Sequence, residues 1–396
     1  MSLIVQKFGG SSVANTNLLL NAAKKIIKKY NEGNEVIAVV SAQGNTTDKL
    51  IAEAFKISPL ASNRELDVLL SSGEQVSIAL LSIAIKKLGF PVISLLGWQA
   101  GFKTDSNFGN AQIKKVETER IKKEIEKKNI VIVAGFQGID SYGDITTFGR
   151  GGSDTSAVAI AAAMKANICQ IYTDVEGVYT ADPHKIPDAR KLSEISYDAM
   201  LEMASLGAQV LNSRSVEIAK KYKVKLEVLS SLTDVPGTIV REMAKNDEIV
   251  ITGITGDKDV AIIEILEMPD KKGENLRIFS KLSDLGINTD VTQQFINDKT
   301  TKNPTFAVKR NILLETLNIL KSCCVNKIFY DSKIAKVSLI GAGLKLHPEV
   351  AAAVFETLNK AKIKVHLSET SETKISVFID NQYMDKAVKI LHDKFF

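Results

Sequence analysis

A polar, glycine-containing stretch within residues 143–166 has the residue types of an anion-binding site. Arg150-Gly-Gly-Ser-Asp154 directly precedes small apolar residues that are typical of a buried helix. A loop that leads into a helix N-terminus presents unpaired backbone N–H groups and the positive end of the helix dipole. Glycines let the backbone approach a ligand, and the arginine fork suits a carboxylate or a phosphate. We therefore predict an anion site here, with an ordinary loop and helix cap as the alternative.

A second glycine turn follows the first predicted strand. Lys7-Phe-Gly-Gly10 comes directly after the apolar residues 3–5. It is not a Walker A loop, because the lysine of that loop follows the glycines. A lysine at the carboxyl end of a strand can still reach a phosphate, although the turn can also be purely structural. Glu74, just before an apolar helix predicted over 76–88, could simply favour the helix dipole.

The elements that must position these residues alternate between strand and helix. Continuous apolar strands of this kind belong to a parallel sheet, and ligands collect at the carboxyl ends of its strands. Lys7-Phe-Gly-Gly10 and Ser41-Ala-Gln-Gly44 both lie at such ends, and the polar segment 173–184 follows another strand as a plausible nucleotide loop. The predicted strands are 3–5, 36–40, 91–96, 130–134, 168–172 and 226–229, and the predicted helices are 15–30, 76–88, 192–203 and 209–221. The sequence thus predicts a doubly wound α/β domain.

The C-terminal third contains an internal repeat, after a boundary in the polar run 241–248. Strands, helices and strands recur in the same order, and three apolar positions keep one offset between the copies. The matching pairs are Phe279 with Phe355, Leu282 with Leu358, and Ile287 with Ile363. Each copy continues into another strand and helix, which gives the ferredoxin-like βαββαβ pattern.

Composition excludes several classes of protein. The chain has 396 residues, of which 45% are hydrophobic and 24% charged, enough for two or three globular domains. The formal net charge is +5, but no basic patch is interleaved with aromatics, so nucleic-acid binding is not expected. Three cysteines, two of them adjacent, argue against a disulfide framework. Without a recognisable signal peptide or membrane-length apolar run, we expect a cytoplasmic protein and no membrane partner.

Taken together, the motifs resemble those of the monofunctional aspartokinases over essentially the whole chain. The resemblance rests on Lys7-Phe-Gly-Gly-Ser-Ser-Val13, Phe148-Gly-Arg-Gly-Gly-Ser-Asp-Thr-Ser-Ala157 and Tyr172-Thr-Asp-Val-Glu-Gly-Val-Tyr-Thr-Ala-Asp-Pro183. It implies an amino-acid-kinase α/β/α sandwich with a mostly parallel sheet, followed by two ferredoxin-like ACT domains. The domain limits predicted on this basis are 1–244 for the catalytic domain, 245–332 for the first ACT domain and 333–396 for the second.

The resemblance also implies a reaction: transfer of the ATP γ-phosphoryl group to the β-carboxylate of L-aspartate. Such a transfer depends mainly on positioning and electrostatic stabilisation. A carboxylate nucleophile is already ionised at neutral pH, with a reference pKa of about 3.9, so it needs no general base. The catalytic half has a single histidine, His184, and lacks Cys/His spacing for zinc. We expect Mg²⁺, carried mainly by the nucleotide phosphates, and no metal site of the protein's own.

The roles that the resemblance implies fall into three groups. Lys7 would stabilise the transferring phosphoryl group, and Asp154 would organise the cationic groups. The expected aspartate contacts are Thr47, Glu74 (to the α-ammonium), Phe136, Arg150 (to a carboxylate), Gly151, Gly152 and Ser153. The expected nucleotide contacts are Lys7, Phe8, Gly9, Gly10, Ser11, Ser41, Thr173, Asp174, Tyr179, Asp182, His184 and Gln209.

The ACT copies are expected to bind an allosteric amino acid, with lysine the first choice and threonine the next, and to support a homo-oligomer. The expected effector contacts are Asp270, Asn288, Thr289, Asp290, Gln294, Val350, Ala351, Lys364, Val365, Ser371 and Glu372. The resemblance further suggests that strand 249–254 pairs with the last ACT domain, which would make the other ACT domain an insertion.

Three positions depart from the family pattern on the nucleotide side. His184 stands where arginine is frequent, Gln209 where lysine is frequent, and Asn212-Ser213 where His-Pro is common. Two other functions were weighed. One is a kinase of glutamate, acetylglutamate or a nucleoside monophosphate, and the other is a catalytically inactive amino-acid sensor. The ACT pair and the placement of Glu74 argue against the first. The presence of Lys7, Glu74, Arg150 and Asp154 argues against the second.

Overall fold

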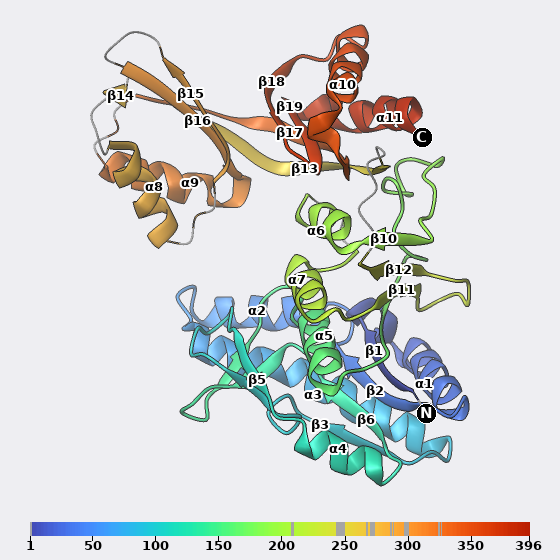
Figure 1. Ribbon diagram of the computed structural model, residues 1–396. Helices are drawn as coiled ribbons and strands as arrows, with labels where there is room; N and C mark the ends of the chain where they lie inside the picture. The colour runs from blue at the N-terminus through green and yellow to red at the C-terminus, as the bar shows by residue number, and fades with distance from the viewer. Residues whose placement is uncertain are drawn as a thin grey trace. The chain divides into compact units, whose positions relative to one another are not determined.

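The structure is a computed structural model, and it describes the chain except for residues 1, 207–209, 243–249, 267, 270–273, 286, 288, 297–300, 324 and 326. The chain forms two compact units. Unit 1 comprises residues 1–179 and 191–245, and unit 2 comprises residues 180–190 and 246–396. Each unit is described by itself below (Figure 1).

Unit 1 is built on an eight-stranded sheet in the order β10-β12-β11-β9-β1-β2-β6-β3. Every neighbouring pair is parallel except β11 with β12, which confirms the predicted mostly parallel sheet. The strands are β1 (Leu3–Phe8), β2 (Glu35–Val40), β3 (Val92–Leu95), β6 (Ile130–Ala134), β9 (Ile168–Thr173), β10 (Glu194–Ser196), β11 (Leu226–Ser230) and β12 (Thr238–Arg241). The central strands are almost entirely buried, because helices cover both of their faces.

Helices α1 and α3 pack on one face of this sheet, and α5 packs on the other. The apolar positions of α1 recur at helical spacing, and Asn15 caps the helix by accepting a hydrogen bond from the Leu18 amide. Helix α5 is buried almost all round, as its small residues predict. The helices are α1 (Thr16–Asn31), α2 (Thr46–Ile57), α3 (Asn63–Lys87), α4 (Glu119–Glu126), α5 (Gly152–Met164), α6 (Tyr197–Ser205) and α7 (Ser213–Tyr222). A short 3₁₀ helix, Gly10–Val13, follows β1.

Unit 1 also contains a second, four-stranded sheet that was not predicted, and this sheet contacts α3 through one of its strands and α5 through two others. Its order is β5-β4-β7-β8, and its short strands pair mainly as antiparallel hairpins. The strands are β4 (Phe102–Thr104), β5 (Ile113–Val116), β7 (Gln137–Ile139) and β8 (Ile145–Thr147). This small sheet ends at Thr147, directly before the turn that carries Arg150.

The structure corrects three predicted helices. Helix α3 begins at Asn63 instead of residue 76, so Glu74 lies in its middle and has no role at a helix start. The early start of α3 was not predicted, because Gly73 interrupts the helical pattern of the sequence. In the structure, a side chain at position 73 would come within 2.8 Å of the Ala42 Cβ, so glycine allows the close packing there. The predicted helix 192–203 begins instead with strand β10, and α6 starts only at Tyr197. Helix α7 starts at Ser213, with Asn212 as its N-cap.

Helix α3 is also long and apolar enough, by composition alone, to span a membrane. Half of its most apolar window is buried within the structure, and Leu70, Ile78, Leu81 and Ile85 belong to the buried residues of unit 1. A buried core helix passes the same test of composition.

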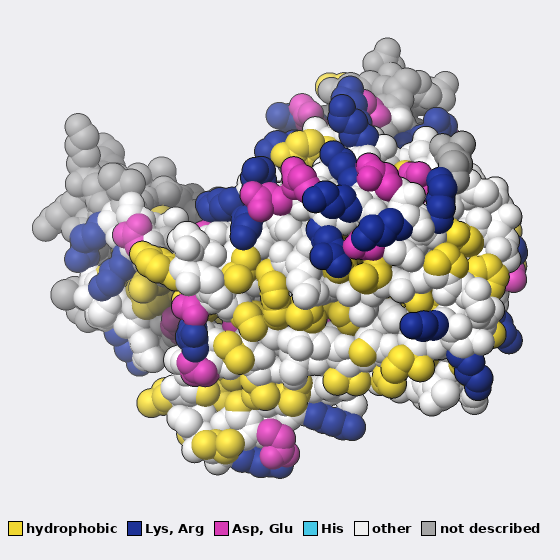
Figure 2. All heavy atoms as spheres, turned by 90° about the horizontal axis from the view of Figure 1, so that it is seen from below, with side chains coloured by type: hydrophobic (Ala, Val, Ile, Leu, Met, Phe, Trp, Pro, Cys, Tyr) yellow, Lys and Arg dark blue, Asp and Glu magenta, His cyan; other side chains and the backbone are white. Residues whose placement is uncertain are grey.

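The face of the molecule shown in Figure 2 mixes hydrophobic patches with basic and acidic side chains that lie close to one another.

Unit 2 contains a seven-stranded, mainly antiparallel sheet. Its main order is β14-β16-β13-β17-β19-β18, and β15 also pairs with β16. The strands are β13 (Val250–Ile265), β14 (Met268–Pro269), β15 (Asp290–Ile296), β16 (Thr301–Lys309), β17 (Ile328–Ala342), β18 (Val365–Thr370) and β19 (Lys374–Asp380). The helices are α8 (Glu274–Asp284), α9 (Leu313–Ser322), α10 (Pro348–Lys360) and α11 (Met384–Phe395), with 3₁₀ turns at Arg310–Ile312, Leu344–Leu346 and Asn381–Tyr383.

The long strands β13 and β17 join the two ferredoxin-like copies into one sheet. The first half of β13 pairs with the second half of β17, so Val250 lies opposite Ala342 and Ile254 opposite Leu339. This confirms the expected pairing of the strand at 249–254 for its described residues. Two pairs of repeat positions also hold: Leu282 and Ile287 are in one core, and Leu358 and Ile363 are in the other. Phe355, in contrast, is 37% exposed.

The segment 180–190 is part of unit 2, although it lies in sequence between two strands of the unit 1 sheet. Ala181 and Ile186 belong to the hydrophobic core of the second ferredoxin-like copy. The Ile254 amide donates to the Thr180 carbonyl at 2.7 Å, and the Thr180 hydroxyl bonds the His392 ring at 2.9 Å. Burial lowers the pKa of His392. The nucleotide candidates Asp182 and His184 therefore lie in a segment that is anchored in the core of unit 2, although their own side chains are exposed.

Candidate active site

A cavity of about 520 Å³ opens at the carboxyl ends of β1 and β2 in unit 1. This is a typical size for a small-molecule site. All seven residues predicted to contact aspartate line it: Thr47, Glu74, Phe136, Arg150, Gly151, Gly152 and Ser153. Lys7, Gly10, Ser41 and Asp154 line it as well. The structure thus brings the glycine turn after β1 and the turn before α5 to one cavity.

Lys7 and Asp154 form an ion pair in this cavity. The Lys7 Nζ lies 2.6 Å from Asp154 Oδ1, and both side chains are largely buried, with exposed fractions of 13% and 11%. Lys7 comes from the end of β1, and Asp154 comes from the first turn of α5, where a carboxylate also favours the helix dipole. An added side chain at Gly9 would meet the Lys7 ammonium at 3.3 Å, and one at Gly10 would meet the Ala42 carbonyl at 2.7 Å. Glycine at position 9 therefore leaves space beside the ammonium, and glycine at position 10 lets the turn pack closely against the loop after β2.

Glu74 projects from the middle of α3 and is 3% exposed. Its Oε1 accepts a hydrogen bond from the Ala42 amide at 3.0 Å, whereas its buried Oε2 has no hydrogen-bond partner among the residues that the structure describes. Burial raises the pKa of Glu74 to about 7, because the carboxylate has lost its water and gains only partial compensation from the amide. A buried carboxylate that lines a cavity and has one oxygen without a partner is suited to a cationic ligand group.

The turn that carries Arg150 is fixed through its backbone. The Phe148 amide donates to the Phe136 carbonyl at 2.9 Å, and the Arg150 carbonyl accepts from the Asn212 side chain at 3.0 Å. Gly151 adopts φ +69°, and a side chain there would meet the Asn212 side chain within 2.5 Å. The Arg150 guanidinium itself is exposed and makes no hydrogen bond or ion pair with the described part of the chain. A guanidinium that has no partner and is carried by a fixed backbone is suited to binding an anionic ligand group such as a carboxylate or a phosphate.

The predicted nucleotide residues are spread more widely. Phe8 is buried and stacks on Tyr172, with ring centroids 4.6 Å apart, so its side chain belongs to the core. Thr173 donates to the Asp174 side chain at 3.0 Å at the end of β9, and burial raises the pKa of Tyr179. Ser11 is exposed. Asp182 and His184 lie in unit 2, where they hydrogen-bond to each other. Gln209 lies outside the described residues.

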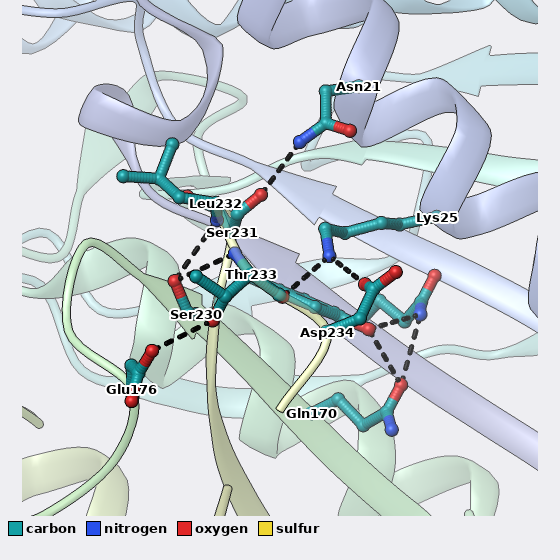
Figure 3. Close-up of polar contacts among 11 residues, drawn as sticks. Asn21, Lys25, Gln170, Glu176, Ser230, Ser231, Leu232, Thr233 and Asp234 are labelled. Carbon is teal, nitrogen blue, oxygen red and sulfur yellow. Dashed lines mark hydrogen bonds and ion pairs between the residues drawn. The ribbon is translucent and has the colours of Figure 1, made fainter. Parts of the chain in front are cut away.

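Beside the end of β9, the loop that follows β11 is tied to its neighbours by a set of polar contacts (Figure 3). Lys25 of α1 donates to the Thr233 carbonyl at 3.0 Å and pairs with Asp234 at 2.6 Å. Asn21 donates to the Ser231 carbonyl at 2.7 Å, and the Thr233 hydroxyl donates to Glu176 at 3.2 Å. The loop therefore supports Glu176, which follows the nucleotide candidates Thr173 and Asp174. Sequence reasoning missed these contacts, since they join segments that are far apart in the chain.

The predicted effector residues lie in both copies of unit 2. Asp290 pairs with Lys336, which is buried and places its ammonium 5.7 Å from the centre of the Phe378 ring. Val350 is buried in the core, where Ala351 and Val365 pack against it, whereas Lys364 and Glu372 are exposed. The Ser371 hydroxyl accepts from the Lys374 amide at 3.1 Å. Thr289 is half-buried; Asp270 and Asn288 lie outside the described residues, as does the side chain of Gln294.

The cavity also contains a residue that sequence reasoning missed, Asp67. It lies seven residues before Glu74 on the same face of α3 and is fully buried. The spacing of two helical turns could have indicated it, but only if α3 had been predicted to begin before residue 76.

Comparisons with known proteins agree with this architecture. The sequence model of the Amino acid kinase family matches residues 2–230, and that of an ACT domain matches residues 337–395. The chain is 46% identical to an aspartokinase of Geobacillus stearothermophilus over 396 residues, covering 100% of this chain and 97% of that protein. It is 44% identical to an aspartokinase of Pseudomonas aeruginosa, covering 100% of this chain and 98% of that protein.

Two solved structures share the fold. The aspartokinase III of E. coli in complex with aspartate and ADP superposes with a TM-score of 0.86 over 100% of both chains, at 22% identity. An aspartate kinase from Synechocystis gives a TM-score of 0.58 at 38% identity, covering 100% of this chain and 69% of that one.

The fold and the cavity define an amino acid kinase that is joined to an ACT module. With full-length relatives above 40% identity, the chain belongs to the aspartokinase family.

Proposed function

We propose that this chain transfers the γ-phosphoryl group of ATP to the β-carboxylate of L-aspartate and forms 4-phospho-L-aspartate, the first step of lysine, threonine and methionine biosynthesis. The observation that carries the proposal is the convergence of a buried carboxylate, an unpaired arginine and a lysine–aspartate pair in one cavity. Glu74, Arg150 and the Lys7–Asp154 pair are the groups in question.

Three charged groups of the cavity, Glu74, Arg150 and Lys7, are complementary to the three charges of the proposed acceptor. L-Aspartate carries one ammonium and two carboxylates. The free Oε2 of Glu74 would accept the ammonium, and the Arg150 fork would grip the α-carboxylate. The β-carboxylate would then lie toward Lys7, whose ammonium would stabilise the charge on the transferring group while Asp154 orients it. Thr47, Phe136 and Ser153 would complete the walls.

The nucleotide would bind along the carboxyl ends of the strands, with its phosphates over the open glycine turn beside Lys7 and Ser41. Its base and ribose would lie near Thr173, Asp174 and Tyr179. Mg²⁺ carried by the phosphates would supply additional charge neutralisation when bound. The carboxylate attacks in its ionised form, so the chain's own residues hold and orient the acceptor and need not remove a proton from it.

The test is a comparison of acceptors. The purified chain with ATP and Mg²⁺ is offered L-aspartate, L-glutamate, N-acetyl-L-glutamate or UMP, and the acyl phosphate is trapped with hydroxylamine. We expect aspartate to give the highest kcat/KM. A clearly better rate with another acceptor would contradict the proposal, and no turnover with any acceptor would favour an amino-acid sensor without catalytic activity.

We further propose that the catalytic domain spans residues 1–244 and that ACT domains at 245–332 and 333–396 bind a regulatory amino acid and assemble the chain into a homo-oligomer in the cytoplasm. The relative in complex with aspartate also exists with lysine, described as its T-state. Lysine is therefore the first effector to test, and threonine the second.

Asp290 is the effector residue whose surroundings are best described. Its carboxylate neutralises the buried Lys336, so an effector ammonium that competes for Asp290 would change this pair. Asp290→Ala should raise the effector concentration that gives half inhibition, with a coupling of about 1–3 kcal/mol at stake. Inhibition curves with lysine and threonine, taken on wild type and variant, provide the test. Overlapping curves for a confirmed inhibitor would remove Asp290 from the regulatory site.

A further inference from the structure

Asp67 is a fully buried carboxylate that the reaction itself does not use. It projects from α3 into the same cavity wall as Glu74. Its Oδ2 accepts from the Thr147 amide at 2.8 Å and from the Gly109 amide at 2.9 Å, and its Oδ1 accepts from the Thr147 hydroxyl at 2.6 Å. All of these donors are neutral. A buried charge that is held only by neutral donors is costly unless each bond is well made.

The partners of Asp67 lead directly to Arg150. Thr147 is the last residue of β8, three positions before Arg150. The Thr147 carbonyl accepts a hydrogen bond from the Ala111 amide at 2.8 Å. Gly149 has a positive φ of +73° and packs closely against the backbone of Gly109. A side chain at Gly149 would meet the Gly109 carbonyl at 3.1 Å. One carboxylate thus fixes both the strand end before the turn and the loop on which the turn rests.

The opposite side of the turn is fixed by α7. Asn212 donates to the Arg150 carbonyl at 3.0 Å, and Arg214 donates to the carbonyls of Phe148 and Ala111 at 3.3 and 2.8 Å. The turn is therefore held by hydrogen bonds from both sides. The Arg150 guanidinium has no partner among the described residues, and Arg150 lines the cavity.

We propose that Asp67 is a positioning residue for aspartate binding, which acts by holding the Thr147 strand end and the Gly109 loop so that Arg150 is presented to the α-carboxylate of the acceptor. This inference rests on the proposed function. Asp67 is fully buried and both of its oxygens are bonded to Thr147 and Gly109, so its effect should pass through Arg150 and appear in the aspartate KM.

The burial of Asp67 raises its pKa, and the bonds to Thr147 and Gly109 oppose that rise. Asp67→Asn keeps the shape of the side chain but places an amide NH₂ group against amide donors, so that at least one bond is lost. A misplacement of about 1 Å at a binding group can cost up to roughly 10²-fold in rate. We therefore expect the aspartate KM to rise by at least about tenfold, with the ATP KM changed by less than about twofold.

The decisive experiment is a double-mutant cycle on the full chain with Asp67→Asn and Arg150→Ala. Wild type is first shown to phosphorylate aspartate, which tests the proposed function separately; if another acceptor is preferred, the same KM comparison is made with it. If Asp67 acts through Arg150, Asp67→Asn should raise the aspartate KM in the wild-type background and add less than about twofold in the Arg150→Ala background. Full additivity, or an unchanged KM in a folded Asp67→Asn protein, would overturn the proposal.

Two further variants keep the test valid if Asp67→Asn folds poorly. Thr147→Val removes only the hydroxyl donor to Asp67, and Thr147→Ser retains it, so the aspartate KM should rise for valine and return toward wild type for serine. Equal KM values for the two would also overturn the proposal. Glu124→Gln is the matched control: Glu124 is a buried carboxylate on α4 outside the cavity, held by Arg120, Lys127 and Asn129. It should leave the aspartate KM unchanged, whatever it does to thermal stability.

Discussion

The two halves of the candidate active site differ in how completely unit 1 forms them. On the aspartate side, Glu74, Asp154 and the Arg150 turn are fixed by buried helices and by hydrogen bonds. On the nucleotide side, the predicted residues are divided between the units, and the side chains of Asp182 and His184 are 47% and 78% exposed. The difference indicates that the pocket proposed for the acceptor is preorganised, whereas the outer contacts proposed for the nucleotide are not.

The largest effect is expected at Lys7, where both halves meet. Lys7→Ala should lower kcat by roughly 10²–10³, the size expected for the loss of one preorganised electrostatic group. Steady-state kinetics with saturating aspartate and ATP measure it. Lys29→Ala is the control, because Lys29 also forms an ion pair at 2.8 Å, with Glu32, but lies outside the cavity. A Lys7→Ala enzyme with wild-type kcat would remove Lys7 from the reacting centre.

Arg150 should affect binding more than chemistry. Arg150→Ala is expected to raise the aspartate KM by about tenfold or more while kcat falls much less, because in the proposed function Arg150 would grip a group outside the reacting centre. Arg241→Ala is a suitable control, since Arg241 pairs with Glu194 at the edge of the sheet. An unchanged aspartate KM in Arg150→Ala would show that the preorganised turn serves another ligand.

The titration of Glu74 should make aspartate binding depend on pH. In the proposed function its ionised form would bind the ammonium of aspartate. Because burial raises the pKa of Glu74 to about 7, aspartate binding would then release a proton below that pH. The aspartate KM should therefore fall as pH rises from 6 to 8. Glu74→Gln should raise the KM and flatten this profile. A variant whose KM follows the wild-type profile would assign the titration to another group.

The same pKa has a consequence for stability without ligand. The folded-state pKa is raised from 4.5 to about 7, so the folded protein holds the proton more tightly than the unfolded chain does. The free energy of unfolding should fall between pH 4.5 and 7 by up to about 3 kcal/mol from this group. Denaturant unfolding of wild type and Glu74→Gln at pH 5 and pH 8 tests this. A variant that loses as much stability as wild type would contradict it.

The smallest effect is expected at the exposed end of the nucleotide side. His184→Ala should change the ATP KM by less than about twofold, because the ring is mostly solvated and its bond to Asp182 is at the surface. Steady-state titration of ATP measures this. A large rise in the ATP KM would mean that His184 is held in the nucleotide site during turnover, and the contrast between the halves would then fail.

Local strand patterns and glycine turns predicted the parallel sheet and the anion site at Arg150. The other expected aspartate contacts came from the resemblance to a known family, and all seven of these residues line the cavity. The sequence did not predict the β4–β8 sheet, the early start of α3 or Asp67. Those features depend on contacts between distant segments: Gly73 is tolerated in α3 because α3 packs against Ala42, and Asp67 matters only because β8 ends beside it. The place of segment 180–190 in unit 2 has no local signal at all.

The most direct test of the preorganised pocket is calorimetric titration of L-aspartate into the nucleotide-free protein at pH 6.5, in two buffers with different ionisation enthalpies. The account predicts binding without ATP, accompanied by release of a proton from Glu74 that disappears in Glu74→Gln. Aspartate binding that requires ATP and Mg²⁺, with none detected in their absence, would contradict it.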